Sequence, residues 1–108
     1  MTRVIGLAGR IGSGKGTAAE YIRRKYGAQQ FVYSDILADL LRQLHLEVTR
    51  DNLQKLGASL RQGLGKDVLV EAMRGEVSAS KADVILIDGL RYVNEVEMLR
   101  SFKNNILI

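Results

Sequence analysis

A glycine-rich segment between an apolar stretch and a helical stretch constrains the fold of this chain most strongly. Residues 9–17 read Gly-Arg-Ile-Gly-Ser-Gly-Lys-Gly-Thr; they follow the apolar residues 4–8 and precede a predicted helix over residues 18–24. A strand that turns through glycines into a helix points several backbone N–H groups at one place, where the helix N-terminus adds partial positive charge. Such a place suits a phosphate group, so the segment predicts a phosphate-binding loop.

The spacing within this segment predicts the nucleotide contacts. Gly9 and Gly14-Lys15 fit the pattern G-x-x-x-x-G-K, in which the lysine reaches the β- and γ-phosphates. Gly16 stands where the pattern has Ser or Thr, so Thr17 is expected to ligate Mg²⁺ directly or to hold it through water. The alternative is a glycine-rich turn with a surface lysine. ATP is expected to contact nine consecutive residues: Gly9, Arg10, Ile11, Gly12, Ser13, Gly14, Lys15, Gly16 and Thr17.

Length, composition and charge limit the class of protein. A chain of 108 residues, 46% hydrophobic and 26% charged, predicts one small globular domain over residues 1–108. The absence of cysteine excludes disulfides and thiolate metal sites. The net charge of +4 comes from dispersed basic residues, so we expect no nucleic-acid partner. No stretch approaches the ~20 apolar residues of a membrane span, and we expect a cytoplasmic protein without a membrane partner.

Predicted strands and helices alternate along the chain. Gly27 ends the first helix, residues 30–33 form a second strand, and Ser34 is a candidate N-cap for a helix with apolar positions at 36, 37, 40, 41 and 44. Thr49 caps the next helix, whose apolar stripe is Leu53, Leu56 and Leu60, and a further helix spans about 66–77. This alternation predicts a parallel α/β sheet of about four strands with right-handed crossovers. Together with the phosphate-binding loop, it resembles the three-layer α/β fold of P-loop NTPases.

The end of the sequence predicts the central and edge strands of that sheet. Within residues 83–89, four consecutive apolar residues lead up to the carboxylate of Asp88, which is typical of a strand buried on both faces. A helix lined by Val93, Val96, Leu99 and Phe102 follows, and residues 106–108 begin a last strand. A short apolar edge strand needs cover. We therefore expect either a longer fold with further C-terminal strands or a homodimer that covers this edge.

Asp88 is the first candidate for chemistry beyond the loop. It ends the predicted central strand, where ligand crevices form in open α/β sheets. A carboxylate at this place holds Mg²⁺ or its waters against the phosphates. The alternative is an aspartate that opens a turn with Gly89.

Arginines at the same end of the sheet are candidates for binding a phosphorylated acceptor. Arg91 follows Asp88 by three residues, and its guanidinium forks onto phosphate oxygens or, alternatively, pairs with Glu95. Arg50, Gln54 and Arg61 share one face of the predicted helix, where they bind a nucleotide or form a solvated surface. Arg61 is the stronger candidate because it lies near the glycines of residues 62–65.

The predicted second helix adds two weaker candidates. Asp35 lies in its first turn, where the carboxylate contacts the acceptor or favours the helix dipole. Arg42 is a further candidate for acceptor binding on the same helix. His45, the only histidine, has no second ligand nearby in sequence and is expected to be a surface or boundary residue.

Taken in order, these motifs resemble a kinase family. The loop, Tyr33-Ser34-Asp35, the segment 49–61 and the segment 87–96 resemble the adenylate-kinase-like group of P-loop kinases, and most closely the deoxynucleoside monophosphate kinases of phage and archaeal type. Asp88-Gly-Leu-Arg91, followed by Glu95, looks like their Asp-x-Arg-x-x-x-Glu region displaced by one glycine. The Asp-Gly-x-Arg form is also similar to adenylate kinases and to archaeal kinases near dephospho-CoA kinase.

The resemblance implies a function and a set of roles. It implies ATP- and Mg²⁺-dependent phosphoryl transfer to a small-molecule phosphate acceptor, with residues 34–80 as a helical insertion that binds the acceptor. Lys15, Arg61 and Arg91 would act in catalysis, Thr17 and Asp88 at the metal. The acceptor would contact Asp35, Arg42, Gln54, Arg61 and Arg91. Members of the family continue with an arginine-bearing lid, a further strand and an adenine-contacting segment, which these 108 residues lack.

Two other functions remain open. A kinase of an alcohol, such as dephospho-CoA, would require Asp35 as a general base toward the hydroxyl. A non-catalytic nucleotide-binding module needs the loop and neither arginine.

Overall fold

A parallel β-sheet forms the centre of the protein. The computed structural model describes residues 2–8 and 15–108, and side chains for 2–8 and 17–108. In this part of the chain, strands lie in the order β2-β3-β1-β4 and all pair in parallel. Their bounds are β1 Arg3–Ala8, β2 Gln29–Val32, β3 Val84–Leu90 and β4 Asn105–Leu107.

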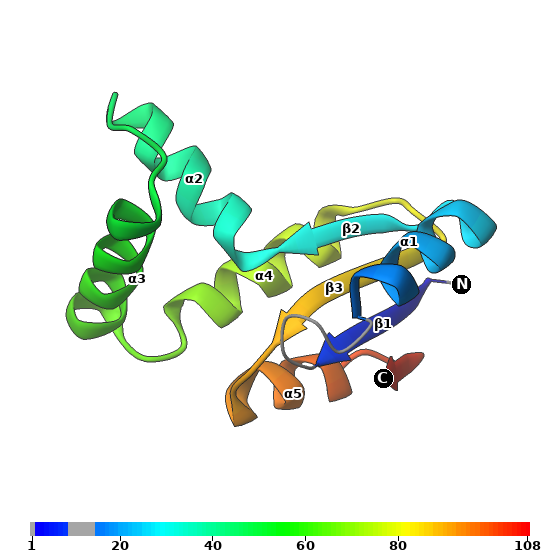
Figure 1. Cartoon of the computed structure of the whole chain (residues 1–108). Coiled ribbons are helices and arrows are strands. Elements are labelled where there is room, and N and C mark those ends of the chain that lie inside the picture. The colour runs from blue at the N-terminus through cyan, green and yellow to red at the C-terminus, as the bar shows by residue number, and fades with distance from the viewer. Residues whose placement is uncertain (1, 9–14) are drawn as a thin grey trace.

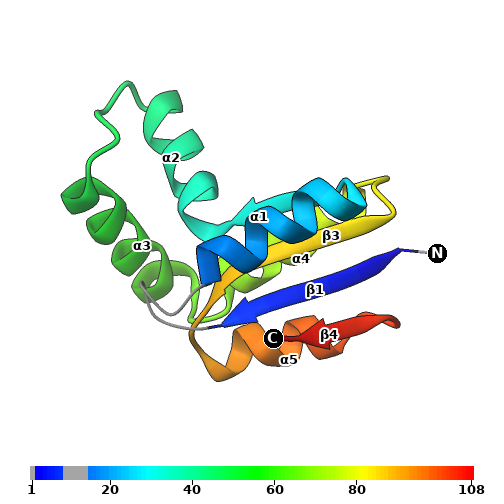
Figure 2. The same cartoon turned by 45° about the vertical axis from the view of Figure 1, so that its right-hand side comes forward.

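Helices cover both faces of the sheet. Their bounds are α1 Lys15–Tyr26, α2 Tyr33–Gln43, α3 Arg50–Leu64, α4 Val68–Ala79 and α5 Val93–Arg100. Helix α1 lies on one face, and α4 and α5 lie on the other (Figures 1 and 2). The predicted α/β architecture is therefore confirmed: three layers around a four-stranded parallel sheet, as in the P-loop NTPase fold.

The core follows from the alternation of side chains along β3. Ile85 and Ile87 pack in one cluster with Met73 of α4 and Met98 of α5. Leu86, between them, packs in a second cluster against Ile22 of α1. The continuous apolar run predicts this burial on both faces, because neighbouring side chains of a strand point to opposite sides.

Gly6 lets helix α5 and the end of β3 pack closely on β1. A Cβ at this position would lie 2.5 Å from Cδ1 of Leu90 and 2.6 Å from Cδ2 of Leu99, and both leucines are buried with little room to move. We expect Gly6→Ala to lower the free energy of unfolding by about 1–3 kcal/mol, the usual cost of overpacking a core. Urea denaturation measures the change. Gly75→Ala in α4, where a Cβ meets nothing within 4 Å, is the control and should not destabilise; equal midpoints for the two variants would contradict the packing argument.

Local sequence signals set several helix ends correctly. The Oγ1 of Thr49 accepts the backbone N–H of Asn52 at 3.1 Å, which is the predicted N-cap of α3. Gly27, with φ of 62°, ends α1 and donates its N–H to the carbonyl of Arg23 at 3.0 Å. Both contacts satisfy backbone groups that a helix end leaves open.

Other local predictions were wrong. Helix α2 begins at Tyr33, so Ser34 lies in its first turn and is not the N-cap; pairing with β3 holds the backbone extended up to Val32. Val93 is 74% exposed because the first residue of α5 faces away from the sheet. Leu44 is 59% exposed because α2 ends before it. In each case, packing of the whole fold overrides the local pattern.

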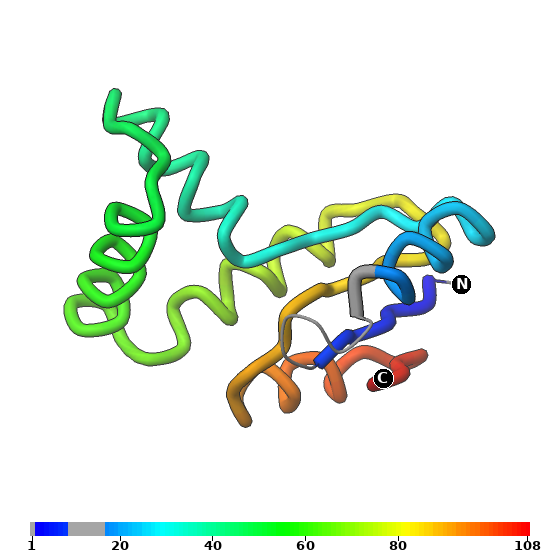
Figure 3. Tube along the Cα trace, viewed as in Figure 1, coloured from blue at the N-terminus to red at the C-terminus, as the bar shows by residue number. Residues whose placement is uncertain are grey.

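Helices α2, α3 and α4 connect β2 to β3. The chain leaves the carboxyl end of β2, passes through α2 and α3 beyond the sheet, and returns along α4 (Figure 3). The carboxyl ends of β1, β2 and β3 point toward α2 and α3 (Figure 1). The helical part of the predicted insertion therefore stands at the edge where ligands bind in such sheets; its acceptor-binding role stays a prediction.

Strand β4 lies at the edge of the sheet beside β1. Ile106 and Ile108 are 41% and 57% exposed, and together with Tyr21 and Tyr26 they line an apolar groove of about 820 Å³ beside α1. The predicted homodimer across this edge stays a prediction. Among the described helices, none is both long and apolar enough to cross a membrane.

Candidate functional site

A cavity of about 470 Å³ opens at the carboxyl end of the sheet. Its walls come from the start of α2, one face of α3 and the segment that follows β3. The lining residues are Val32, Tyr33, Ser34, Leu37, Leu53, Gln54, Gly57, Arg61, Asp88, Gly89, Arg91, Tyr92 and Glu95. The fold thus brings together Gln54, Arg61, Asp88 and Arg91, which the sequence predicts as site residues.

Asp88 lines the cavity and lies beside β1, the strand that precedes the predicted phosphate loop in the sequence. It is opposite Leu7 in the register of β3 with β1, two residues before the loop begins. Gly89, with φ of 84°, is an extra residue at this point, because Ala8 pairs with Leu90. A bulge position with this left-handed backbone conformation favours glycine, and the bulge changes the direction of the neighbouring side chains. The amide of Gln30 on β2 donates to Oδ2 of Asp88 at 3.2 Å, so a neighbouring strand orients the carboxylate.

Two arginines line the same cavity, and neither forms an ion pair with a described residue. Arg61 comes from α3 and Arg91 from the turn after β3. By contrast, Arg42 pairs with Asp39 at 2.9 Å and Arg74 with Glu71 at 3.2 Å. A pair of unneutralised arginines can take up a phosphate by forked hydrogen bonds.

Glu95 shapes the turn that carries Arg91. It is 6% exposed, and its Oε1 accepts the backbone N–H groups of Arg91 at 2.7 Å and of Tyr92 at 3.0 Å. The alternative pairing of the Arg91 guanidinium with Glu95 is therefore not the contact present: the backbone donates instead. A Glu three residues into a helix often caps its start, so the position of Glu95 carried this signal.

Tyr33 contributes a buried hydroxyl near Glu95. The side chain is half-buried, and its hydroxyl has no hydrogen-bond partner among the described residues. Burial raises the pKa of Tyr33, the Glu95 carboxylate raises this pKa further, and the Arg74 guanidinium opposes the rise. Tyr33 is therefore a neutral phenol at physiological pH, and its hydroxyl adds no charge beside the arginines.

Several predicted residues lie outside the cavity. Asp35 and Arg50 are exposed and do not line it, and Arg42 is held by Asp39 on the outer side of α2. Of the nine predicted loop residues, Gly9, Arg10, Ile11, Gly12, Ser13 and Gly14 lie outside the described residues, as do the side chains of Lys15 and Gly16.

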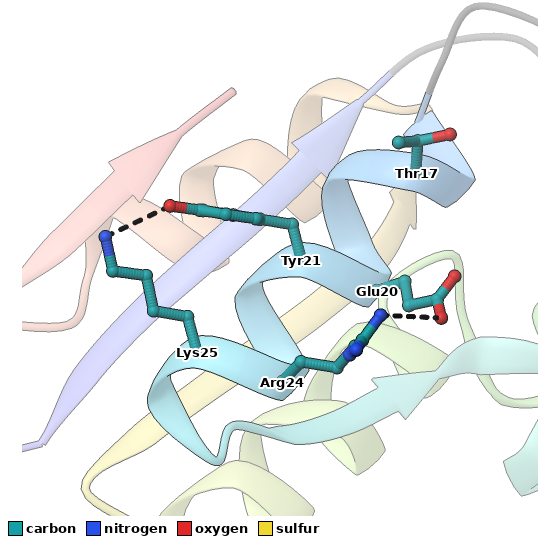
Figure 4. Close-up of a pocket in the computed structure, with 5 residues that line it drawn as sticks. All are labelled: Thr17, Glu20, Tyr21, Arg24 and Lys25. Carbon is teal, nitrogen blue, oxygen red and sulfur yellow. Dashed lines mark hydrogen bonds and ion pairs between the residues drawn. The ribbon is translucent and has the colours of Figure 1, made fainter.

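Thr17 lies in the first turn of α1 and lines a different surface pocket of about 560 Å³ (Figure 4). Its neighbours there are Glu20, Tyr21, Arg24 and Lys25. Lys25 donates to the hydroxyl of Tyr21 at 3.0 Å and lies 5.4 Å from the centre of its ring. This pocket shares no lining residue with the cavity of Asp88, and the role of Thr17 at a metal stays a prediction.

The carboxylate ligand available at the cavity suits Mg²⁺ better than a metal ion that is enclosed by protein side chains alone. Among the described residues, no group of three or more His, Cys, Asp or Glu side chains could enclose an ion. Mg²⁺ commonly takes one or two protein carboxylates and completes its shell with phosphate oxygens and water. The half-buried carboxylate of Asp88, opposite Leu7 in the sheet, is a ligand of this kind, and its role at a metal stays a prediction.

Sequence reasoning missed Gly57 and Tyr92, which line the cavity, and Gln30, which does not line it but contacts Asp88. Gln30 contacts Asp88 between β2 and β3, and Gly57 lies close to Leu37 between α3 and α2. Contacts between elements distant in sequence leave no local sequence pattern. Tyr92 is 57% exposed and presents an aromatic ring at the cavity. The position of Tyr92 directly after Arg91 was the sequence signal that could have identified it as a site residue.

Archaeal proteins of similar sequence are about twice as long or longer. A UPF0200 protein of Hyperthermus butylicus is 29% identical over 97% of this chain and 56% of its own length. A UPF0200 protein of Methanoculleus marisnigri is 33% identical over 91% of this chain and 53% of its own. For a UPF0200/UPF0201 protein of Archaeoglobus fulgidus the figures are 32%, 91% and 31%. The chain thus spans about half the length of the first two, and none of these names states an activity.

A family model described as AAA domain matches residues 8–107, from the end of β1 to the end of β4. The match covers the phosphate loop segment, the strands β2, β3 and β4 and all residues that line the cavity. This agrees with a P-loop kinase-like domain, a fold that implies nucleotide binding. Because the match spans nearly all of its residues, the chain belongs to the AAA domain family.

Proposed function

We propose that this domain transfers the γ-phosphoryl group of ATP to the phosphate of a ribo- or deoxynucleoside monophosphate. The observation that carries the proposal is the pair of arginines, Arg61 and Arg91, that line one cavity with Asp88 beside the start of the phosphate loop. Neither arginine forms an ion pair with a described residue, and the one other carboxylate of that lining, Glu95, accepts two backbone N–H groups. The chain covers about half of its first relatives, so the activity of the whole protein is part of this proposal.

On the donor side, the loop amides and Lys15 would hold the ATP phosphates. Asp88, oriented by Gln30, would hold Mg²⁺ or its waters. When bound, Mg²⁺ supplies charge neutralisation of the phosphates. The remaining work in such a transfer is positioning, which a fixed carboxylate and fixed backbone donors provide.

On the acceptor side, the guanidinium groups would bring a phosphate oxygen in line with the γ-phosphorus. A bond forms from that oxygen to phosphorus as the bond to the bridging oxygen of ADP breaks, so a nucleoside monophosphate becomes a diphosphate. The amide of Gln54 and the ring of Tyr92 offer a hydrogen bond and a stacking surface to the base. A volume of about 470 Å³ lies within the range of small-molecule sites.

A phosphate acceptor is better supported than an alcohol. An alcohol needs a general base within hydrogen-bond reach of its hydroxyl. Asp35, the sequence candidate for that base, is exposed and does not line the cavity. We expect Asp35→Asn to change turnover by less than about threefold, because a phosphate acceptor needs no such base. A loss of turnover of about 100-fold, with unchanged ATP binding, would favour the alcohol acceptor.

Transfer of label identifies the acceptor directly. The protein is incubated with Mg²⁺, γ-³²P-ATP and each candidate acceptor, and the products are separated by thin-layer chromatography. The proposal predicts labelled nucleoside diphosphate. Label in a phosphoester of dephospho-CoA would instead show that the domain is a kinase of an alcohol, and the proposed acceptor would be wrong. Labelled inorganic phosphate alone, or no turnover, would leave a nucleotide-binding module and end the kinase proposal for this chain.

A further inference from the structure

Helix α3 carries a glycine at its one buried position. Gly57 lies near the middle of the helix, whose other residues are half-buried or exposed, and it lines the cavity. Glycine is the poorest helix former apart from proline, because it leaves the backbone free in the unfolded chain. A glycine at the centre of a 15-residue helix therefore needs a reason other than helix formation.

The reason lies in the space that a side chain would fill. A Cβ on Gly57 would lie 3.3 Å from Nη1 and 3.9 Å from Cζ of Arg61, and 3.4 Å from Cδ1 of Leu37 on α2. The guanidinium of Arg61 thus lies back along α3 over Gly57, one turn earlier, as side chains four residues apart do. The residue opposite, Leu37, is buried, so α2 cannot give way easily.

We propose that Gly57 is a positioning residue for Arg61 and thereby sets the affinity of the cavity for the acceptor phosphate. The missing side chain leaves room for the guanidinium of Arg61 over Gly57, and Gly57, Arg61 and Arg91 line the same cavity. The inference rests on the proposed function for the identity of the ligand. The placement of Arg61 by Gly57 rests on the geometry alone.

The substitution Gly57→Ala should move stability and function in different directions. Alanine favours the helix, so the unfolding midpoint should not fall. Its methyl group would push the guanidinium of Arg61 by a few tenths of an ångström, because the contact at 3.3 Å is tighter than ordinary packing and Leu37 closes the other side. We expect the KM for the acceptor to rise about tenfold while the KM for ATP stays unchanged. A merely structural role would change stability and both KM values together.

The same helix offers a matched control. Gly63 lies six residues further along α3 and is exposed, and a Cβ at this position would meet nothing within 4 Å. Gly63→Ala therefore makes the same glycine-to-alanine change in the same helix without touching Arg61. Its KM for the acceptor should equal that of the wild type.

Two measurements on the folded chain test the inference. The first is the pair of KM values for the wild type, Gly57→Ala and Gly63→Ala. The second is the ¹⁵N–¹H crosspeak of the Arg61 Nε–H in the free protein, assigned by its loss in Arg61→Gln. A shifted crosspeak and a raised acceptor KM in Gly57→Ala alone are expected. An unmoved crosspeak, or equal acceptor KM values for the two alanine variants, would overturn the inference. If the wild type shows no acceptor-dependent turnover, the proposed function fails, and the crosspeak alone decides whether Gly57 positions Arg61.

Discussion

Replacing Arg61 or Arg91 by glutamine is expected to raise the KM for the acceptor about 100-fold, with the Kd for ATP within about twofold of the wild type. Each arginine lines the cavity and has no ion pair with a described residue, so its charge is available to a phosphate. Glutamine keeps hydrogen-bond donors but loses the charge and the fork. Steady-state kinetics at saturating ATP, with ATP binding by calorimetry, separate the two effects.

The control for this prediction removes a positive charge elsewhere. Arg23 is exposed in the last turn of α1, at the far end of that helix from the phosphate loop. Arg23→Gln should leave the KM for the acceptor unchanged. If Arg61→Gln and Arg91→Gln behave like Arg23→Gln, the cavity is not the acceptor site.

Replacing Asp88 by asparagine is expected to lower kcat about 100-fold and to weaken the dependence of turnover on Mg²⁺ concentration. The substitution keeps the size of the side chain and removes the charge that lies beside the loop at the end of β3. Mg²⁺ titration of turnover measures the change. Fluorescence of a nucleotide analogue without Mg²⁺ should report unchanged binding, because the loop amides remain.

The contact from Gln30 gives a graded version of this test. Its amide donates to Oδ2 of Asp88 from β2, so Gln30→Ala should lower kcat less than Asp88→Asn, by about tenfold. An Asp88→Asn variant with wild-type kcat and Mg²⁺ dependence would show that Asp88 only opens the turn at Gly89, as the alternative interpretation holds.

The sequence predicts the part of the site that depends on chain order. Asp88 ends an apolar run and Arg91 follows it, so both lie at the carboxyl edge of the sheet once the strands are parallel. Gln54 and Arg61 are seven residues apart on α3 and so share a face. These four residues line one cavity in the structure. Their positions could be predicted because each depends on helix periodicity or on the end of a strand.

The parts that the sequence could not predict depend on contacts between distant elements. The close approach of Gly57 to Leu37 needs the packing of α2 on α3, and the bond from Gln30 to Asp88 needs the order of strands in the sheet. The N-cap assigned to Ser34 failed because pairing of Val32 with Asp88 decides where β2 ends. Asp35 and Arg42 lie on the predicted helix, but the orientation of α2 turns them away from the cavity.

The acceptor dependence of ADP formation tests the central claim most directly. ADP is measured from ATP and Mg²⁺ with a panel of ribo- and deoxynucleoside monophosphates and dephospho-CoA, beside a Lys15→Ala variant that gives the background. We predict turnover that requires one class of nucleoside monophosphate and vanishes in the variant. ADP formation that no member of the panel raises above the Lys15→Ala background would contradict phosphoryl transfer by this chain.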